Sequence, residues 1–220
     1  MQTDQRLTDA YSLYEASVFY GDESAVDRAM PVLDSLEADL ALARGRLLHA
    51  AYLKHRDQEN PDELKCFQRA AELYQALGDE RGEAEALFWI GTYHQVLHLD
   101  GQASIPFLDR AEELAQRSGD KLLLSYVVRH QGAVEQYVHG DLEAARKRQQ
   151  QSVDLRREVG HRPGVAAGLL ALADIAGEQG DEAERERLLD EAEAIATESG
   201  ARGTLRWISA AREVSDGDGN

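Results

Sequence analysis

The sequence predicts an all-α protein built as a row of about five helix hairpins, mainly because a break in the chain recurs at constant spacing. Gly78, Gly119, Gly160 and Gly200 follow one another at intervals of 41, 41 and 40 residues. An apolar residue stands five positions before each of them: Leu73, Leu114, Leu155 and Ile195. Two landmarks of different chemistry that stay in register through four units indicate a structural repeat. No useful stretch alternates apolar and polar residues as a strand would.

Each repeat contains two helices. After the break at Gly119, residues 121–139 favour a helix, and Gly140 separates them from a second helical stretch at 142–159. Glycine supplies the left-handed conformation that ends a helix, and the aspartate that follows both glycines can cap the next one. A pair of helices totalling about 40 residues cannot bury its own apolar stripe, so neighbouring pairs must stack.

These breaks give a layout for the whole chain. Pro61 suits the first turn of a helix, and no Pro/Ser-rich stretch marks a linker, so we expect residues 1–214 to form a single domain. The layout comprises helix pairs at about 5–37, 39–77, 80–117, 121–158 and 163–198, a capping helix at 201–214, and a flexible tail at 215–220.

Composition narrows the class of protein. Hydrophobic residues make up 43% of the 220 residues and charged residues 30%, which is ordinary for a folded domain large enough to bury a continuous core. The formal net charge is −17. Nucleic-acid binding requires a positive surface that displaces counterions, so we expect no nucleic acid among the partners.

Location follows from apolar runs and cysteine usage. The first residues contain no apolar stretch behind a basic flank, so we expect no secretory signal. The longest run of small apolar residues, 165–173, is too short to cross a bilayer, and we expect no membrane contact. Cys66 is the single cysteine and cannot form an internal disulfide. That usage is typical of a reducing compartment and predicts a cytoplasmic protein.

The sequence offers little chemistry. His94 and His98 share a helix face, but the zinc-peptidase motif needs a glutamate after the first histidine, and Gln95 stands there. His98 and His139 occupy equivalent positions near helix ends, where the helix dipole favours histidine. No phosphate loop, dinucleotide motif or nucleophile elbow occurs. We therefore expect no enzyme, no catalytic residue, no bound metal and no cofactor.

A cluster of basic residues has two interpretations. Arg146-Lys147-Arg148 is followed by Arg156, Arg157 and Arg162. Such a cluster can bind a phosphate or an acidic partner, or it can pair with acidic side chains of adjacent repeats. We favour the second interpretation.

One known family shares these features. Residues 87–94, Leu-Phe-Trp-Ile-Gly-Thr-Tyr-His, approximate its pattern of a large residue, Leu-Gly and an aromatic, and Ala103 and Phe107 match the alanine and the aromatic of its second helix. In the next unit Ala144 keeps the alanine, but Arg148 replaces the aromatic. The chain thus resembles the tetratricopeptide repeat family, in the form of about 40 residues found in bacterial regulators. The resemblance implies a right-handed α-solenoid whose first helices line a concave groove.

The resemblance also implies which residues face that groove. If Ala51 (or equally Ala50), Gly91, Gly132 and Ala173 are the close-packed small residues, certain neighbours point toward a ligand. These are Tyr52, His55, Arg56, Phe88, Thr92, Gln95, Tyr126, Arg129, Gln136, Tyr137, Asp174 and Glu178. Their mixture suits an extended peptide or a polar small ligand, and the two arginines favour a carboxylate or acidic partner.

Three functions follow, in order of preference. The first is a non-catalytic scaffold or adaptor that binds a protein or peptide segment in the groove. The second is a regulatory module that senses a peptide or small ligand and acts through a partner protein. The third is an enzyme or metal protein built on the same scaffold. Self-association through the terminal repeats, most simply as a homodimer, stays open.

Overall fold

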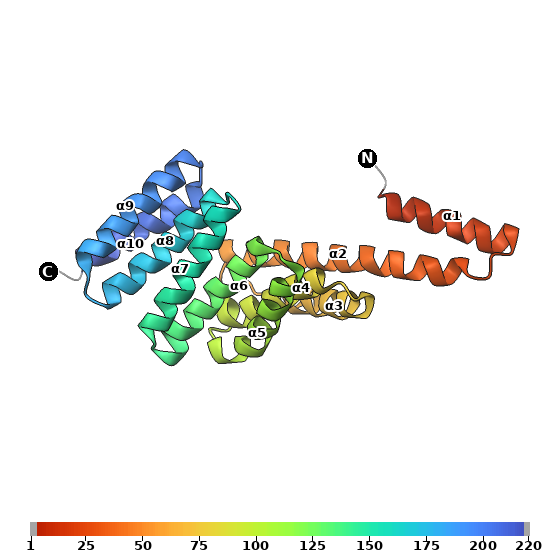
Figure 1. Cartoon of the computed structure of the whole chain (residues 1–220), viewed down its shortest axis with the longest axis horizontal. Helices are drawn as coiled ribbons and strands as arrows, with labels where there is room; N and C mark the ends of the chain where they lie inside the picture. The colour runs from red at the N-terminus through yellow and green to blue at the C-terminus, as the bar shows by residue number, and fades with distance from the viewer. Residues whose placement is uncertain (1–3, 218–220) are drawn as a thin grey trace. The chain divides into compact units, whose positions relative to one another are not determined.

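The computed structural model describes residues 4–217, with residues 214–217 described by their backbone alone (Figure 1). All regular structure in this range is helical, with ten α-helices, one five-residue π-helical turn and no strand, so the all-α prediction is confirmed. The chain divides into two compact units, one ending at Leu99 and one beginning at Asp100. The expectation of a single domain over residues 1–214 stays a prediction.

The N-terminal unit contains four helices: α1 (Gln5–Tyr20), α2 (Ala25–Lys54), α3 (Asp62–Leu77) and α4 (Glu80–Leu97). Each helix contacts the next one along the chain, and α2 also contacts α4. Phe67 is fully buried and stacks on Trp89, with ring centroids 5.6 Å apart and an interplanar angle of 11°. This aromatic pair links α3 to α4 in the core of the unit.

The structure differs from the expected layout within this unit. We expected one helix pair to end at residue 37 and the next to begin at residue 39, but α2 runs through this point as a single helix of 30 residues. The segment around it, Ser-Leu-Glu-Ala-Asp-Leu-Ala, contains neither glycine nor proline. With no residue suited to the left-handed conformation, nothing in the local chemistry ends the helix.

The C-terminal unit contains six α-helices and a π-helical turn. They are α5 (Gly101–Ser118), α6 (Lys121–Val134), η1 (Glu135–His139), α7 (Leu142–Glu158), α8 (Arg162–Glu178), α9 (Glu182–Glu198) and α10 (Arg202–Gly217). Each contacts its sequence neighbour, and α8 also contacts α10. The core gathers Val153, Leu169, Leu188 and Ile208 from four of these helices. These contacts make the unit a stack of helix hairpins with α10 against the last one.

The helix ends predicted at glycines are present. Seven glycines end helices in the left-handed conformation, as Gly119 does with φ of +71°. The aspartate after this glycine accepts a hydrogen bond from the backbone N–H of Leu123 at 2.9 Å, which caps α6. At the C-terminus α10 continues to Gly217, three residues into the expected tail. The remaining tail residues, 218–220, lie outside the described range. No helix within that range combines the length and apolar character that crossing a membrane requires.

Replacing Gly82 by alanine should lower the free energy of unfolding by roughly 1–3 kcal/mol, the usual cost of overpacking a core. A Cβ atom at Gly82 would lie 2.4 Å from Cδ1 of Tyr74. That ring is buried and its hydroxyl donates to Asp39 at 2.7 Å, so it cannot move aside freely. Urea unfolding followed by circular dichroism measures the change. The matched control is Gly203→Ala, because open space surrounds Gly203. Equal stability of the two variants would contradict this account.

Candidate functional site

A pocket of about 660 Å³ opens in the C-terminal unit among α6, η1, α8 and α10. Small apolar side chains such as Ala133, Ala167 and Ala171 form much of its wall. The structure also brings together here five of the twelve residues assigned to the groove: Arg129, Gln136, Tyr137, Asp174 and Glu178. The size is typical of sites for small ligands or peptide side chains. This pocket is therefore the candidate site.

Arg129 on α6 has an unusual environment for a charged side chain. Its Nε atom is closed off from solvent and has no hydrogen-bond partner. No ion pair or side-chain hydrogen bond joins its guanidinium to any residue in the described range. Burial lowers the pKa of Arg129 because desolvation disfavours the charged form. An arginine left unpaired in a pocket is a ready donor for a carboxylate or another planar anion.

A second buried arginine lies close by. Arg156 on α7 is 1% exposed, and Nε donates to Ser125 Oγ at 3.2 Å and Nη1 to the carbonyl of Gly164 at 2.8 Å. Its guanidinium carbon lies 4.8 Å from the centre of the Tyr126 ring, a cation–π contact. No carboxylate pairs with it in the described range. Burial, and next the charge of Arg129, lower the pKa of Arg156 to about 10. The two arginines therefore give this region a positive potential.

The opposite wall of the pocket is acidic. Asp174 and Glu178 lie one turn apart on α8, and Gln136 Nε2 donates to both, at 3.0 and 2.6 Å. The Tyr137 hydroxyl also donates to Asp174, at 2.8 Å. The pKa of Tyr137 is raised, first because its hydroxyl is desolvated in the pocket although the residue as a whole is 69% exposed, and then by the Asp174 carboxylate. Neither acid has a cationic partner in the described range.

The π-helical turn explains how two consecutive residues reach the same carboxylate. Gln136 and Tyr137 both lie in η1 and both donate to Oδ2 of Asp174. In a regular α-helix neighbouring side chains diverge by about 100°. The wider π turn reduces this angle, and such turns are frequent at functional sites.

Helix α10 contributes a wall that the sequence analysis missed. Trp207 and Ile208 are consecutive in the capping helix, but only Ile208 is buried, whereas Trp207 is 56% exposed and lines the pocket. Arg185 on α9 also lines it and is fixed by its Nη2, which donates to the carbonyl of Ala211 at 2.7 Å. Consecutive residues on a helix point to different faces. That rule alone was enough to separate Trp207 from Ile208.

The other groove candidates lie elsewhere. Tyr126 contacts Arg156, and its ring lies 6.0 Å from that of His161. The remaining six belong to the N-terminal unit. Tyr52 is buried in α2, His55 and Arg56 are exposed beyond its end, Phe88 and Thr92 are buried in α4, and Gln95 is half-buried.

The connection between α2 and α3 is longer than those between the other helices, and it explains why a different residue of α2 packs against α3 than the one we expected. The small residue in close contact is Gly45, where an added Cβ would lie 2.5 Å from Cε1 of Phe67, and not Ala51, which is exposed. The loop at residues 55–61 shifts the register of α2 relative to α3. In the C-terminal unit Gly132 does pack closely, since its Cβ would lie 2.8 Å from Nε2 of Gln149.

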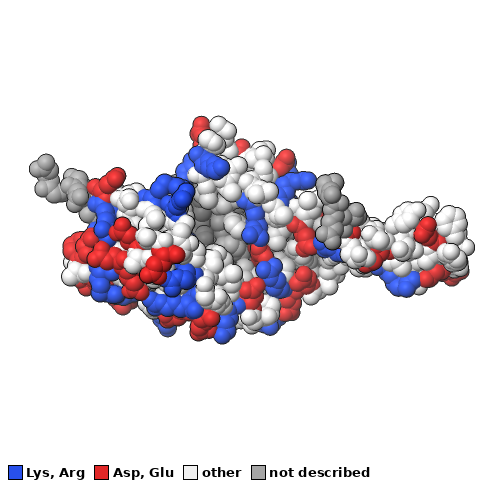
Figure 2. Space-filling model, turned by 90° about the horizontal axis from the view of Figure 1, so that it is seen from above, with Lys and Arg blue, Asp and Glu red and all other residues white. Residues whose placement is uncertain are grey.

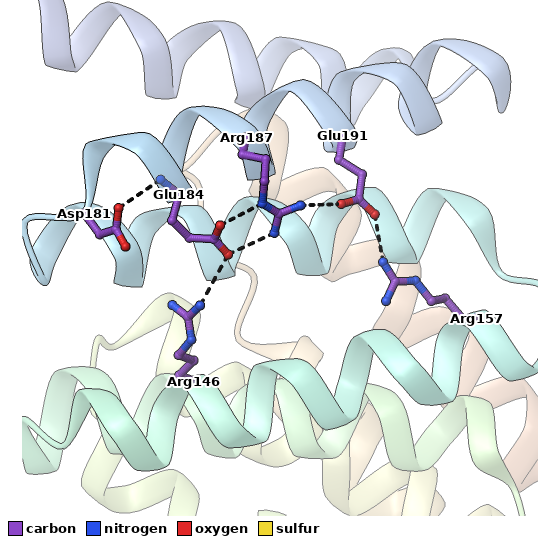
Figure 3. A network of polar contacts seen from close by, with 6 residues as sticks. All are labelled: Arg146, Arg157, Asp181, Glu184, Arg187 and Glu191. Atoms are coloured by element: carbon purple, nitrogen blue, oxygen red, sulfur yellow. Dashed lines mark hydrogen bonds and ion pairs between the residues drawn. The ribbon is translucent and has the colours of Figure 1, made fainter.

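The basic cluster pairs with acids, as the favoured interpretation predicted. Arg146 contacts Glu184 at 3.4 Å, Arg148 contacts Glu112 at 2.8 Å, and Arg157 contacts Glu191 at 2.8 Å. Figure 3 shows two of these pairs bridging α7 and α9, with a further arginine of α9 between the two glutamates. On the face drawn in Figure 2, basic and acidic side chains are accordingly interspersed. Within the described residues, Arg156 and the exposed Lys147 are the members of the cluster that form no ion pair.

The two histidines considered as metal ligands have other neighbours. The rings of His94 and His98 lie 6.4 Å apart, and Nε2 of His98 lies 3.5 Å from Glu59. His139 bonds Glu135 at 2.8 Å. Within the described residues, no group of three or more His, Cys, Asp or Glu side chains is arranged to hold a metal ion.

Comparison with known proteins gives likenesses of fold. No family model and no curated protein matches the chain. Among solved structures it is similar to BtubC (BKLC) of P. vanneervenii, with 16% identity, 89% of this chain and 90% of that chain covered, and a TM-score of 0.47. It is also similar to a Podosopora anserina protein described as a kinesin light chain with nearly identical TPR-like repeats. That match has 16% identity, covers 91% of this chain and 100% of the other, and has a TM-score of 0.28.

Proposed function

We propose that this chain is a non-catalytic binding scaffold of the tetratricopeptide type, and that the pocket of the C-terminal unit holds a peptide segment by its acidic group. The observation that carries the proposal is the unpaired guanidinium of Arg129, which is half-buried in the pocket with its Nε atom closed off from solvent. A buried charge without a counterion is costly. A ligand carboxylate would remove that cost, and the neighbouring charge of Arg156 would strengthen the attraction.

The lining favours binding over catalysis. The pocket is formed by Arg, Gln, Tyr, Asp, Glu, Trp and small or aliphatic residues, and its described lining contains no Ser, Thr, Cys, His or Lys. Its carboxylates accept hydrogen bonds from the Gln136 amide and the Tyr137 hydroxyl. Such groups suit recognition of charge and shape, whereas covalent catalysis would call for a nucleophile with an adjacent base.

Two short probes and one substitution test the proposal. The probes are N-acetyl-Ala-Ala-Glu with a free carboxyl end and the uncharged N-acetyl-Ala-Ala-Gln amide, titrated by calorimetry and by the fluorescence of Trp207. We expect the acid to bind at least tenfold more tightly, the usual range for a charge-assisted hydrogen bond, and Arg129→Gln to abolish the difference.

The control for this experiment is Arg206→Gln. It removes the same charge from an exposed position on α10 outside the pocket. It should leave the preference for the acid intact. Equal binding of acid and amide by the natural protein, or an undiminished preference in Arg129→Gln, would refute the proposal.

A sensing module is the second candidate, and the pocket volume favours it. About 660 Å³ is within the range that accommodates a free small ligand, and the walls come from both the last hairpin and α10. A ligand bound there would bridge the two. A thermal-shift screen with peptides and small anions separates the candidates, since a free ligand that binds the folded state raises the melting temperature without a protein partner.

A further inference from the structure

The pocket lining contains charged side chains of both signs that have no ion-pair partner in the described part of the chain, in addition to Arg185, which pairs with Glu182 and Glu186. Arg129 on α6 lines the pocket and has no carboxylate partner, and neither has Arg156 of α7, which is close to Arg129 but outside the lining. Asp174 and Glu178 lie on α8 and have no cationic partner. Opposite charges that share one pocket would ordinarily pair with each other. Here the chain keeps them apart.

Residues of η1 maintain this separation. Gln136, 6% exposed, donates to both carboxylates and holds them on its side of the pocket. The Tyr137 hydroxyl donates to Asp174, and the same side chain lies within the electrostatic reach of Arg129. Tyr137 thus occupies one acceptor position on the acid.

We infer that the pocket selects a ligand that itself carries both charges: a short zwitterionic peptide with its carboxylate on Arg129 and its ammonium group on Asp174 and Glu178. This inference rests on the proposed function, because it adds a second requirement to the carboxylate site. Each pole of the ligand would neutralise charges that the protein leaves uncompensated. A simple anion would satisfy one pole and meet repulsion from the two acids at the other.

The spacing of the poles sets the length of the ligand. Gln136 holds both acids, and its backbone lies seven residues from that of Arg129, or roughly 10 Å along the helix axis, which we take as the distance that the ligand spans. An extended peptide advances about 3.3 Å per residue. A tripeptide with free ends therefore matches the pocket better than a single amino acid or a pentapeptide.

The two ends of the ligand should contribute unequally to its binding affinity. Arg129 is enclosed at Nε, whereas Asp174 and Glu178 are exposed side chains. Ion pairs at exposed positions are screened by water and salt. The free ammonium group should therefore tighten binding only about threefold, and the free carboxylate at least tenfold.

The experiment uses trialanine in four forms, with its amino end free or acetylated and its carboxyl end free or amidated. Calorimetry with the full chain gives the affinity of each form. We expect the form with both ends free to bind most tightly. The double variant Asp174→Asn/Glu178→Gln should lose the preference for the free amino end and keep the preference for the free carboxylate. Arg129→Gln should lose the preference for the carboxylate.

A matched control isolates the local effect of the two acids. Asp154 and Glu158 form another exposed pair one turn apart, on α7 and outside the pocket lining. Asp154→Asn/Glu158→Gln removes the same net charge and should leave both preferences unchanged. A control variant that also loses the amino-end preference would overturn the inference, because the effect would then come from the overall charge.

The remaining outcomes distinguish this inference from the proposed function. If the natural protein shows no amino-end preference, or keeps it in Asp174→Asn/Glu178→Gln, the zwitterion inference is wrong while an Arg129-dependent carboxylate preference still supports the proposed function. If the carboxylate preference is absent as well, both are wrong. Equal binding of dialanine, trialanine and pentaalanine would overturn the spacing.

Discussion

Replacing His49 by alanine is expected to lower the free energy of unfolding by about 3 kcal/mol, because it leaves a fully buried carboxyl group without its hydrogen-bond partner. Nδ1 of His49 lies 2.9 Å from Oε1 of Glu63, and both side chains are buried between α2 and α3. Glu63 is 0% exposed, and its Oε2 atom has no hydrogen-bond partner. Without the imidazole the carboxyl group of Glu63 would stay buried without the hydrogen bond that His49 makes to it.

The loss of stability in His49→Ala should exceed the loss expected from the missing packing contacts of the histidine ring alone. The His49 ring also lies edge-on to Trp89, with centroids 5.3 Å apart, so some packing is lost with it. The double variant His49→Leu/Glu63→Leu separates the packing contribution from that of the unsatisfied carboxyl group. Because it removes both polar groups, it should recover most of the stability. His55→Ala, at an exposed position just beyond α2, is the neutral control. Urea unfolding that places His49→Ala within about 1 kcal/mol of the natural chain would contradict the assignment.

Replacing Arg156 by methionine is expected to have the opposite sign and to raise the free energy of unfolding by about 1–4 kcal/mol. The substitution removes a charge that is buried without a carboxylate and keeps a long side chain over the Tyr126 ring. Ser125 Oγ, which loses its contact with Arg156, still donates to the carbonyl of Leu122 at 2.7 Å. The same substitution should weaken binding of N-acetyl-Ala-Ala-Glu, so that stability rises as function falls.

Two measurements check this prediction. Urea unfolding gives the stability, with Arg157→Met as the control, because that arginine is exposed and pairs with Glu191 on the surface. The pKa of His161, followed by NMR, reports the charge. It is lowered mainly by burial and next by Arg156, so it should rise in Arg156→Met yet stay below its ordinary value. A variant less stable than the natural chain, or an unmoved His161, would refute the account.

The part of the fold that local chemistry determines was predictable. Glycine in the left-handed conformation followed by a capping aspartate ends one helix and begins the next, so Gly119 and Gly140 located the boundaries of α6 and α7. The same reasoning misplaced a boundary at residue 38, where the chain has neither residue and α2 continues. The position of that break had been extrapolated from the period alone.

The candidate site was predictable where the repeat keeps its length. In the C-terminal unit, residues counted from Gly132 and Ala173 reached Arg129 and Asp174 in the pocket. In the N-terminal unit the loop at 55–61 changed the register, and Tyr52 is buried instead. Arg156 and Trp207 could not be placed by counting along first helices, because one comes from a second helix and the other from α10.

The five-residue turn at Glu135–His139 has a consequence for how this recognition surface can vary. A π turn amounts to one inserted amino acid within an otherwise regular helix. A chain shorter by one residue here would keep every hairpin, its caps and its core. Its tyrosine, however, would swing by about 100° and no longer share an acceptor with the amide before it. The shared contact of Gln136 and Tyr137 with Asp174 thus depends on the number of residues in a single turn. Deleting one codon there would remove that contact without changing any other amino acid.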